Sequence, residues 1–198
     1  MVGMAADALI FDLDGTVWDS ASWFATALAR GDPAAADTHR TQLIDGGNII
    51  KALDHAGMSR NRLLSEALCS GPPPLFPAMR EALNELAARG LAIGVATSLP
   101  GTLALPMLAA ADLADVFGIV VHAGTCRTPK PHPRSILMAL DLLNIPASPT
   151  CFYVGDRASD ADAAARAGVS FAWMSHGYER PAADTQIRPV SPEELLEL

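Results

Sequence analysis

Short apolar runs recur along the chain, and each gives way to polar or turn-forming residues. The first run, Ala8 to Phe11, ends in Asp12-Leu13-Asp14-Gly15-Thr16. Short apolar runs bounded by turn residues are typical of buried strands, so the pattern predicts strands at each of them. The other four predicted strands are Leu91 to Ala96, Phe117 to Val121, Cys151 to Val154 and Val169 to Met174.

A helical pattern precedes each of these four later strands. These patterns cover Ala78 to Arg89, Thr102 to Ala111, Ser135 to Leu143 and Asp160 to Ala167. Arg89-Gly90 closes the first with the cation and glycine that are common at helix C-termini. Strands that alternate with helices favour a parallel sheet covered on both faces. The predicted fold class is therefore α/β, a doubly wound, Rossmann-like parallel sheet.

The segment between the first strand and Ala78 departs from this alternation, because its patterns are helical throughout. We expect helices near Ser20 to Arg30, Pro33 to Leu43, Asn48 to Ala56 and Arg60 to Cys69. Gly71-Pro72-Pro73-Pro74 then forms a stiff connector that neither a helix nor a central strand would cross. The sequence thus predicts an α/β core of residues 1–17 and 75–198, with a small all-helical cap of residues 18–74 inserted after the first strand.

Composition narrows the possible functions. The 198 residues include 14 Lys or Arg against 22 Asp or Glu, a formal charge of −8 that argues against nucleic-acid binding. Half the residues are apolar, enough for a sizeable core and too many for a disordered chain. No apolar run reaches the ~20 residues of a membrane span, and the first residues lack the charged front of a signal peptide. We expect a cytoplasmic protein, monomeric or homodimeric.

Polar residues that follow the predicted strands are the candidates for chemistry. In an open α/β sheet, ligands bind beyond the carboxyl ends of the strands. Those positions hold four carboxylates, two hydroxyls and a lysine: Asp12, Asp14, Asp156, Asp160, Thr97, Ser98 and Lys130. Carboxylates gathered without an equal number of basic groups repel one another, and a hard cation such as Mg²⁺ resolves that repulsion.

The segment from Phe11 to Ser20, FDLDGTVWDS, resembles the first motif of the haloacid dehalogenase superfamily, in its phosphatase branch. Val95 to Ser98, Pro129 to Pro133 and Gly155 to Asp160 are similar to its second, third and fourth motifs, in the same order. The resemblance covers the whole chain. It is nearest to the phosphoglycolate phosphatase-like group, and the helical insertion matches the small C1-type cap of this superfamily.

The resemblance and the residue chemistry imply roles for five residues. Asp12 is expected to attack phosphorus and form an aspartyl-phosphate. Asp14 would protonate the leaving oxygen and then deprotonate water, a role that favours phosphate esters over dehalogenation. Thr97 and the backbone N–H at Ser98 would bind the phosphoryl group. Lys130, one of only two lysines, would supply a fixed positive charge.

A magnesium site is expected beside these residues. Asp156 and the side chain of Asp12 would be direct ligands, together with the backbone carbonyl of Asp14. Asp160 has two readings that the sequence leaves open: it orients Lys130 or a water at the metal site, or it caps the helix that follows.

The predicted substrate is a small phosphorylated metabolite. Residues expected to contact it are Gly15, Trp18 at the first connector, and Gly47, whose neighbouring glycine would let the backbone approach a ligand. Each has an ordinary alternative, because tryptophans usually pack in a helical core and Gly-Gly pairs usually form turns.

The sequence therefore favours a Mg²⁺-dependent phosphate monoester hydrolase. A phosphomutase of the same fold is the main alternative. A non-enzymatic phospho-receiver domain is a third, although its phosphorylated aspartate would follow a middle strand and no cap would be present. A binding protein that kept the motifs without turnover is a fourth.

Overall fold

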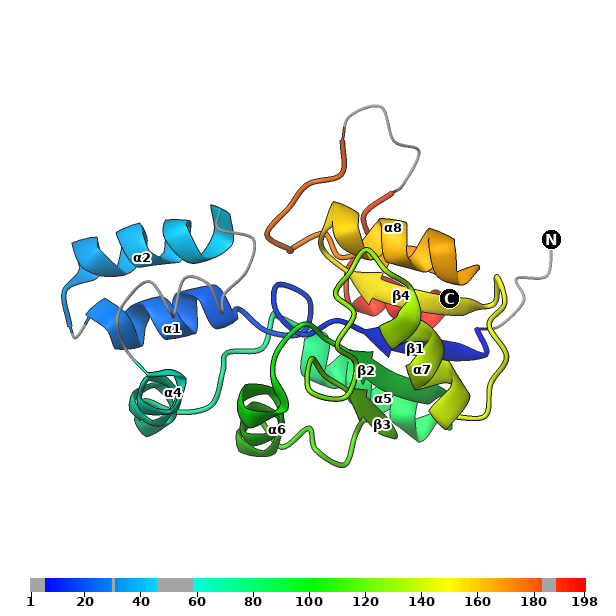
Figure 1. Ribbon diagram of the computed structural model, residues 1–198, viewed down its shortest axis with the longest axis horizontal. Helices are drawn as coiled ribbons and strands as arrows, with labels where there is room; N and C mark the ends of the chain where they lie inside the picture. The colour runs from blue at the N-terminus through cyan, green and yellow to red at the C-terminus, as the bar shows by residue number, and fades with distance from the viewer. Residues whose placement is uncertain (1–5, 30, 46–58, 183–187) are drawn as a thin grey trace.

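A computed structural model of the chain (Figure 1) describes residues 6–29, 31–45, 59–182 and 188–198. Its five strands form one parallel sheet in the order β3-β2-β1-β4-β5, which confirms the predicted α/β class. The strands are β1 (Ala8–Phe11), β2 (Ala92–Ala96), β3 (Ile119–Val121), β4 (Cys151–Gly155) and β5 (Ser170–Trp173).

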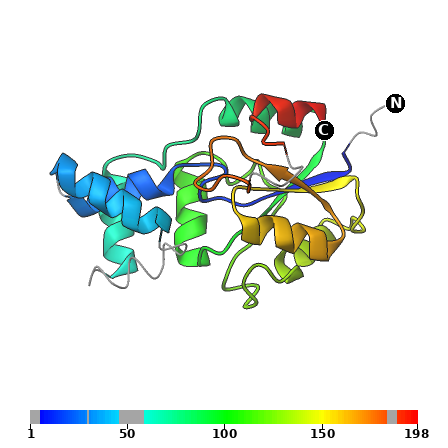
Figure 2. The same cartoon turned by 90° about the horizontal axis from the view of Figure 1, so that it is seen from above.

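Helices cover both faces of this sheet (Figure 2). One face carries α7 (Arg134–Leu142) and α8 (Ala158–Ala167), and the other carries α5 (Met79–Ala88), α6 (Gly101–Ala110) and the 3₁₀ helix η1 (Glu193–Glu197). Successive residues of a strand point to opposite faces, so Leu9 and Phe11 join the core under α5 and α6, and Ile10 joins the core under α7 and α8. The central strand is buried on both sides for this reason.

The sheet places the predicted catalytic residues at one edge. β1 pairs with β2 on one side and with β4 on the other, so the connections diverge between β1 and β4. The backbone N–H of Asp12 donates to the carbonyl of Val154 over 2.8 Å, and that of Thr97 donates to Val121 over 2.9 Å. Both residues therefore continue the hydrogen-bonding pattern of their strands, and their side chains emerge at the same carboxyl edge, where ligands bind in such sheets.

The remaining helices lie to one side of the sheet in Figure 1: α1 (Ser20–Ala29), α2 (Pro33–Asp45) and α4 (Arg60–Cys69). α1 packs against both of the others, and its aromatic rings Trp23 and Phe24 lie 4.9 Å apart between centroids. The indole of Trp23 also donates to the carbonyl of Gly71 over 3.2 Å. The expected helix at Asn48 to Ala56 lies outside the described residues.

Two connectors join these helices to the sheet, and they run side by side. The backbone N–H of Asp19 donates to the carbonyl of Pro74 over 2.9 Å, and that of Phe76 donates to Val17 over 3.2 Å. The proline run and the residues just after it thus pair with the last residues of the first motif. These contacts lie close to the predicted boundaries at residues 17/18 and 74/75.

Most predicted elements differ from the structure by one or two residues at their ends. β3 begins at Ile119, where its pairing with β2 starts, and Phe117 lies before it and packs its ring edge-on against Phe11 with centroids 5.9 Å apart. α8 begins at Ala158, two residues before the predicted start, which places Asp160 inside its first turn. In the described part of the chain, no helix combines the length and apolar character needed to cross a membrane.

Candidate active site

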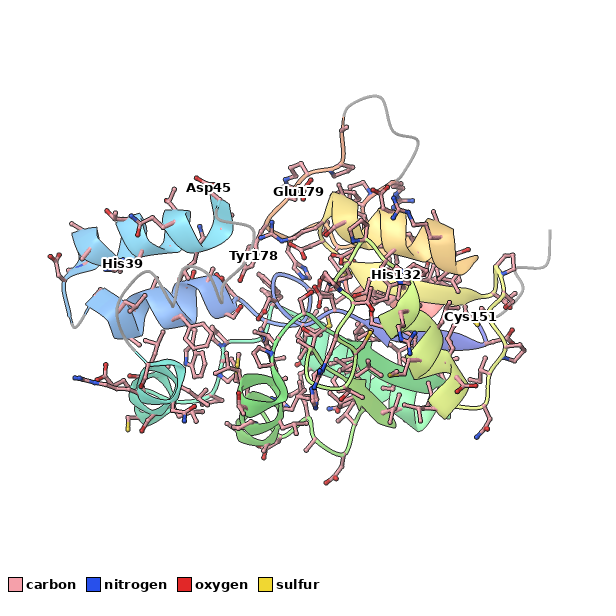
Figure 3. All side chains as sticks on the ribbon, viewed as in Figure 1. His39, Asp45, His132, Cys151, Tyr178 and Glu179 are labelled. Carbon is pink, nitrogen blue, oxygen red and sulfur yellow. The ribbon has the colours of Figure 1, made fainter. Side chains whose placement is uncertain are left out.

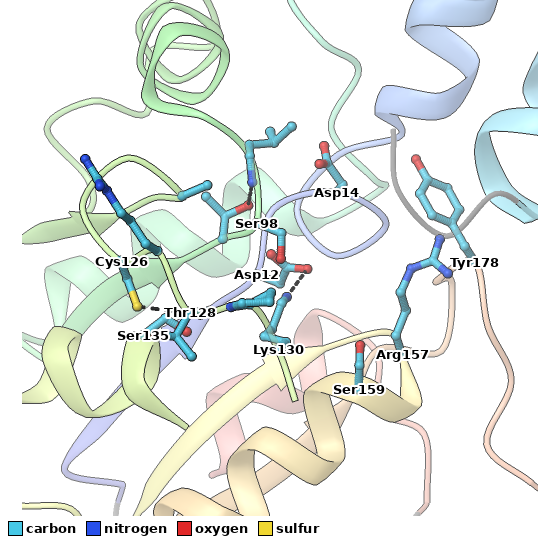
Figure 4. A pocket seen from close by; sticks show the side chains of 15 residues that line it. Asp12, Asp14, Ser98, Cys126, Thr128, Lys130, Ser135, Arg157, Ser159 and Tyr178 are labelled. Carbon is cyan, nitrogen blue, oxygen red and sulfur yellow. Dashed lines mark hydrogen bonds and ion pairs between the residues drawn. The ribbon is translucent and has the colours of Figure 1, made fainter. Parts of the chain in front are cut away.

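A pocket of about 380 Å³ opens at the carboxyl edge of the sheet (Figure 4). Its lining includes five of the residues that the sequence singled out: Asp12, Asp14, Thr97, Ser98 and Lys130. They come from three strand ends that are far apart in the sequence. The volume is at the small end of the range for metabolite sites, which suits a small molecule.

Lys130 stands between two buried carboxylates. Its Nζ lies 2.8 Å from Asp12 Oδ2 and 2.6 Å from Asp160 Oδ1. It also donates to the hydroxyl of Tyr153 over 3.1 Å, and that hydroxyl in turn donates to the carbonyl of Ala96 over 2.7 Å. Burial alone would lower the pKa of Lys130, but the charges of Asp12 and Asp160 outweigh it and hold that pKa well above its usual value. The ammonium is therefore a permanent positive charge beside Asp12.

Asp12, Asp156 and Asp160 could share a cation, since each offers a carboxylate oxygen within 4.8 Å of the others. Asp12 Oδ1 is buried and accepts no hydrogen bond from the described residues. A buried carboxylate oxygen without a partner is costly, and a cation would satisfy it. Burial raises the pKa of Asp156 to about 7, with the charges of Asp160 and Asp12 adding to the rise. The donor set is all oxygen, as Mg²⁺ prefers.

Two hydrogen bonds also hold the carboxylate of Asp156 in place. Its Oδ2 accepts the backbone N–H of Tyr178 over 2.8 Å, and its Oδ1 accepts the hydroxyl of Thr16 over 3.4 Å. A Cβ at Gly15, where φ is 78°, would lie 2.4 Å from Asp156 Oδ2, so only glycine lets the first motif approach this carboxylate. Gly15 packs behind Asp156 and is not among the residues that line the pocket.

Asp160 combines the two roles that the sequence left open. Its Oδ1 pairs with Lys130, while its Oδ2 accepts the backbone N–H groups of Arg157 over 3.1 Å and Asp156 over 3.3 Å. Arg157 immediately precedes α8, so this carboxylate caps the helix from its third position. One side chain thus anchors the helix and orients the lysine.

Asp14 lines the pocket next to Asp12. Burial raises its pKa to about 6, and the charge of Asp12 adds to the rise. Its Oδ1 accepts the indole N–H of Trp18 over 3.1 Å, and Trp18 itself is fully buried. The structure therefore places Trp18 behind Asp14 and not in the pocket lining. Gly47, the other predicted contact, lies outside the described residues.

Tyr178 lines the pocket, although none of the four sequence motifs includes it. Its hydroxyl donates to Asp19 Oδ1 and accepts the backbone N–H of Ala21, both over 2.9 Å. Its own backbone N–H holds Asp156. The residue lies between helices α1 and α2 and the sheet (Figure 3) and connects the candidate metal ligand to the first connector. Arg157 and Ser159 also line the pocket and had no predicted role.

The comparisons with known proteins agree with this geometry. A family model described as haloacid dehalogenase-like hydrolase matches residues 9–174. The chain belongs to this family. Among curated relatives, a phosphoglycolate phosphatase of Yersinia pseudotuberculosis is 31% identical and one of Pectobacterium atrosepticum is 32% identical. These alignments span 88% of this chain and 83% and 82% of the two relatives.

A solved structure of the same family has the same fold. It is a hydrolase of subfamily IA, variant 1, from Geobacter sulfurreducens, with a TM-score of 0.69 and 25% identity, and the match covers 98% of this chain and 99% of that one. The family model and the curated relatives together place the chain among the phosphatases of the haloacid dehalogenase-like hydrolases.

Proposed function

We propose that this haloacid dehalogenase-like hydrolase is a Mg²⁺-dependent phosphate monoester hydrolase that works through an aspartyl-phosphate on Asp12. The observation that carries the proposal is the state of the Asp12 carboxylate. One oxygen pairs with Lys130, and the other is buried without a partner among the described residues. A carboxylate in this setting is oriented by Lys130, and its second oxygen is not engaged by any described group.

The two steps of the reaction follow from the neighbours of Asp12. In the first, an Asp12 oxygen bonds to phosphorus, the bond to the ester oxygen breaks, and Asp14 gives its proton to the leaving alkoxide. In the second, water bonds to phosphorus, the bond to Asp12 breaks, and Asp14 recovers a proton from that water. Thr97 and the backbone N–H at Ser98 hold the phosphoryl oxygens throughout.

Magnesium would be held by the side chains of Asp12 and Asp156 and by the backbone carbonyl of Asp14, with Asp160 beside them. When bound, the ion neutralises charge on the phosphoryl oxygens and on the carboxylates. Together with Lys130 it offsets three of the four carboxylate charges, and a proton on Asp14 offsets the fourth. A site that is acidic in sequence can therefore accept an anionic ester.

The substrate we propose is a small phosphorylated acid. The pocket volume of about 380 Å³ supports a small metabolite, and the curated relatives that align with most of this chain bear the name phosphoglycolate phosphatase. We further propose that residues 18–74 form the cap and that residues 1–17 and 75–198 form the core. A cytoplasmic location and a monomeric or dimeric state remain predictions.

The proposed function is tested with an aryl phosphate, with and without Mg²⁺. Wild type should release phosphate only with the metal, and Asp12→Asn should lose this activity while it keeps its melting temperature. Asp162→Asn, an exposed carboxylate of α8, is the matched control and should behave as wild type. Full turnover by Asp12→Asn would show that Asp12 is not the nucleophile.

A hexose phosphate separates the hydrolase from the phosphomutase alternative. A hydrolase releases inorganic phosphate and forms no isomer of the sugar phosphate. Conversion to the isomer without release of phosphate would favour the mutase instead.

A further inference from the structure

Arg157 brings to the pocket a positive charge that the proposed reaction does not use. Lys130 is already paired with Asp12 and Asp160, whereas Arg157 forms no ion pair with a carboxylate in the described part of the chain. Within residues 6–29, 31–45, 59–182 and 188–198, its one side-chain hydrogen bond goes from Nη2 to the backbone carbonyl of Ile44 over 3.3 Å. Several N–H donors of a guanidinium that lines the pocket are therefore free to bind a ligand.

The neighbours of Arg157 hold the guanidinium on one side of the pocket. Its Cζ lies 5.8 Å from the centroid of the Tyr178 ring, and the hydroxyl of that ring is fixed by Asp19 and Ala21. Ile44 belongs to the last turn of α2, where free carbonyls attract a cation. Figure 4 shows Arg157 beside Tyr178, on the opposite side of the pocket from Ser98.

That side is where the alcohol part of a bound ester would lie. The phosphoryl group sits between Asp12, Thr97 and Lys130 in the proposed reaction, and the leaving oxygen faces Asp14. In that arrangement, groups attached to that oxygen would extend away from Ser98, toward the side of the pocket where Figure 4 shows Arg157. In the proposed reaction Mg²⁺, Lys130 and the proton on Asp14 are already matched to the four carboxylates, so a second negative charge on the substrate needs a further cation, and the guanidinium of Arg157 can supply it.

We propose that Arg157 is the residue that selects the substrate, by binding a carboxylate on the alcohol part of the phosphate ester. This inference rests on the proposed function and assigns its specificity to one side chain. A guanidinium matches a carboxylate with two parallel N–H donors, and charge-assisted bonds of this kind are stronger than neutral ones. The carbonyl of Ile44 is a weak neutral partner, which a substrate carboxylate can replace or share.

The competing explanation is that Arg157 only links α8 to α2 through the carbonyl of Ile44. Two substitutions separate these roles. Arg157→Gln removes the charge and keeps an amide N–H that can reach a carbonyl. Arg157→Lys keeps the charge and loses the planar pair of donors. Arg134, an exposed arginine that is not among the residues lining the pocket, offers Arg134→Gln as a control with the same change in net charge.

The experiment compares phosphoglycolate with its neutral amide, phosphoglycolamide, as substrates with Mg²⁺ present. Wild type should prefer the acid in kcat/KM. Arg157→Gln should lower that preference about 10- to 100-fold, chiefly by raising KM for the acid. KM for the amide and inhibition by inorganic phosphate should stay as in wild type. Arg157→Lys should recover part of the preference, and Arg134→Gln should keep all of it.

Two outcomes would overturn the inference: equal preference for acid and amide in wild type, or an equal loss on both substrates in Arg157→Gln. A binding measurement separates this failure from a failure of the proposed function. In the Asp12→Asn background, calorimetry should show that phosphoglycolate binds about 10- to 100-fold more weakly when Arg157→Gln is added. If wild type hydrolyses no phosphate ester, the proposed function fails, and this binding comparison still decides the role of Arg157.

Discussion

The indole N–H of Trp18 donates a hydrogen bond to Asp14 Oδ1 over 3.1 Å. Trp18 is fully buried, and its backbone pairs with Leu75 of the second connector, so the indole is a fixed donor. An oxygen that accepts this bond is a poor site for a proton, and the proton that Asp14 transfers therefore resides on Oδ2. In the proposed reaction, Trp18 acts through Asp14 by deciding which oxygen is the acid.

Replacing Trp18 with phenylalanine removes this donor and keeps a buried ring. We expect kcat/KM for alkyl phosphates to fall about 5-fold, because loss of one such hydrogen bond is worth about 1 kcal/mol. Aryl phosphates should be affected less, since their leaving groups hardly need a proton. Steady-state kinetics on both ester classes measure the difference. Trp23→Phe, which also removes an indole donor, should not change the ratio between the two classes, and an equal fall on both classes in Trp18→Phe would exclude the positioning role.

Stability of the metal-free protein should decrease as pH rises from 5 to 8. The folded pKa of Asp156 is about 7, above its ordinary value of 3.8, so the folded state binds a proton in this range that the unfolded state has lost. The stabilisation of the folded state by this bound proton is present at low pH and is lost as pH rises through 7. In Asp156→Asn, the fall in the free energy of unfolding between pH 5 and pH 8 should be smaller by on the order of 2–4 kcal/mol. Urea unfolding in the presence of a chelator measures it. An unchanged slope in this variant would contradict the assignment.

Magnesium should reverse the destabilisation at pH 8, because a cation offsets the same buried charges. Adding Mg²⁺ should raise the melting temperature of wild type at this pH. It should raise that of Asp156→Asn much less. The same shift in both proteins would mean that Asp156 is not a ligand.

Tyr178→Phe should separate the two contacts of this residue. Without the hydroxyl, the N–H of Ala21 loses its partner, and we expect a loss of about 1–3 kcal/mol in the free energy of unfolding. The backbone N–H that holds Asp156 remains, so the affinity for Mg²⁺ should stay within about twofold of wild type. Denaturant unfolding and a calorimetric Mg²⁺ titration measure the two quantities. A stable variant with weakened metal binding would show that the hydroxyl supports the metal site instead.

The sheet and five of the pocket residues could be predicted because each is marked by a pattern within one short segment of the sequence. Each apolar run ends in its own polar residues, and the carboxyl ends of parallel strands meet at one edge. Asp12, Thr97 and Lys130 therefore come together once the strands are placed in a parallel sheet. The position of Asp160 in the helix was harder to predict, because α8 begins two residues early and the same carboxylate serves both the helix and the lysine.

Tyr178 and Arg157 could not be assigned from the sequence, because their contacts join distant segments. The hydroxyl of Tyr178 meets the backbone of Ala21, 157 residues earlier, and Arg157 reaches Ile44, 113 residues earlier. No periodicity or motif relates these pairs. Trp18 was predicted at the substrate because it lies at the first connector, yet the backbone pairing with Leu75 places its ring behind Asp14.

The central claim is that phosphate is carried on Asp12 during turnover. Borohydride reduces an acyl phosphate to an alcohol, so trapping during hydrolysis with Mg²⁺ should convert Asp12 to homoserine, located by mass spectrometry of the peptide around residue 12. The conversion should require both substrate and metal. Hydrolysis that proceeds with an unmodified Asp12, or with the modification at another carboxylate, would contradict the account.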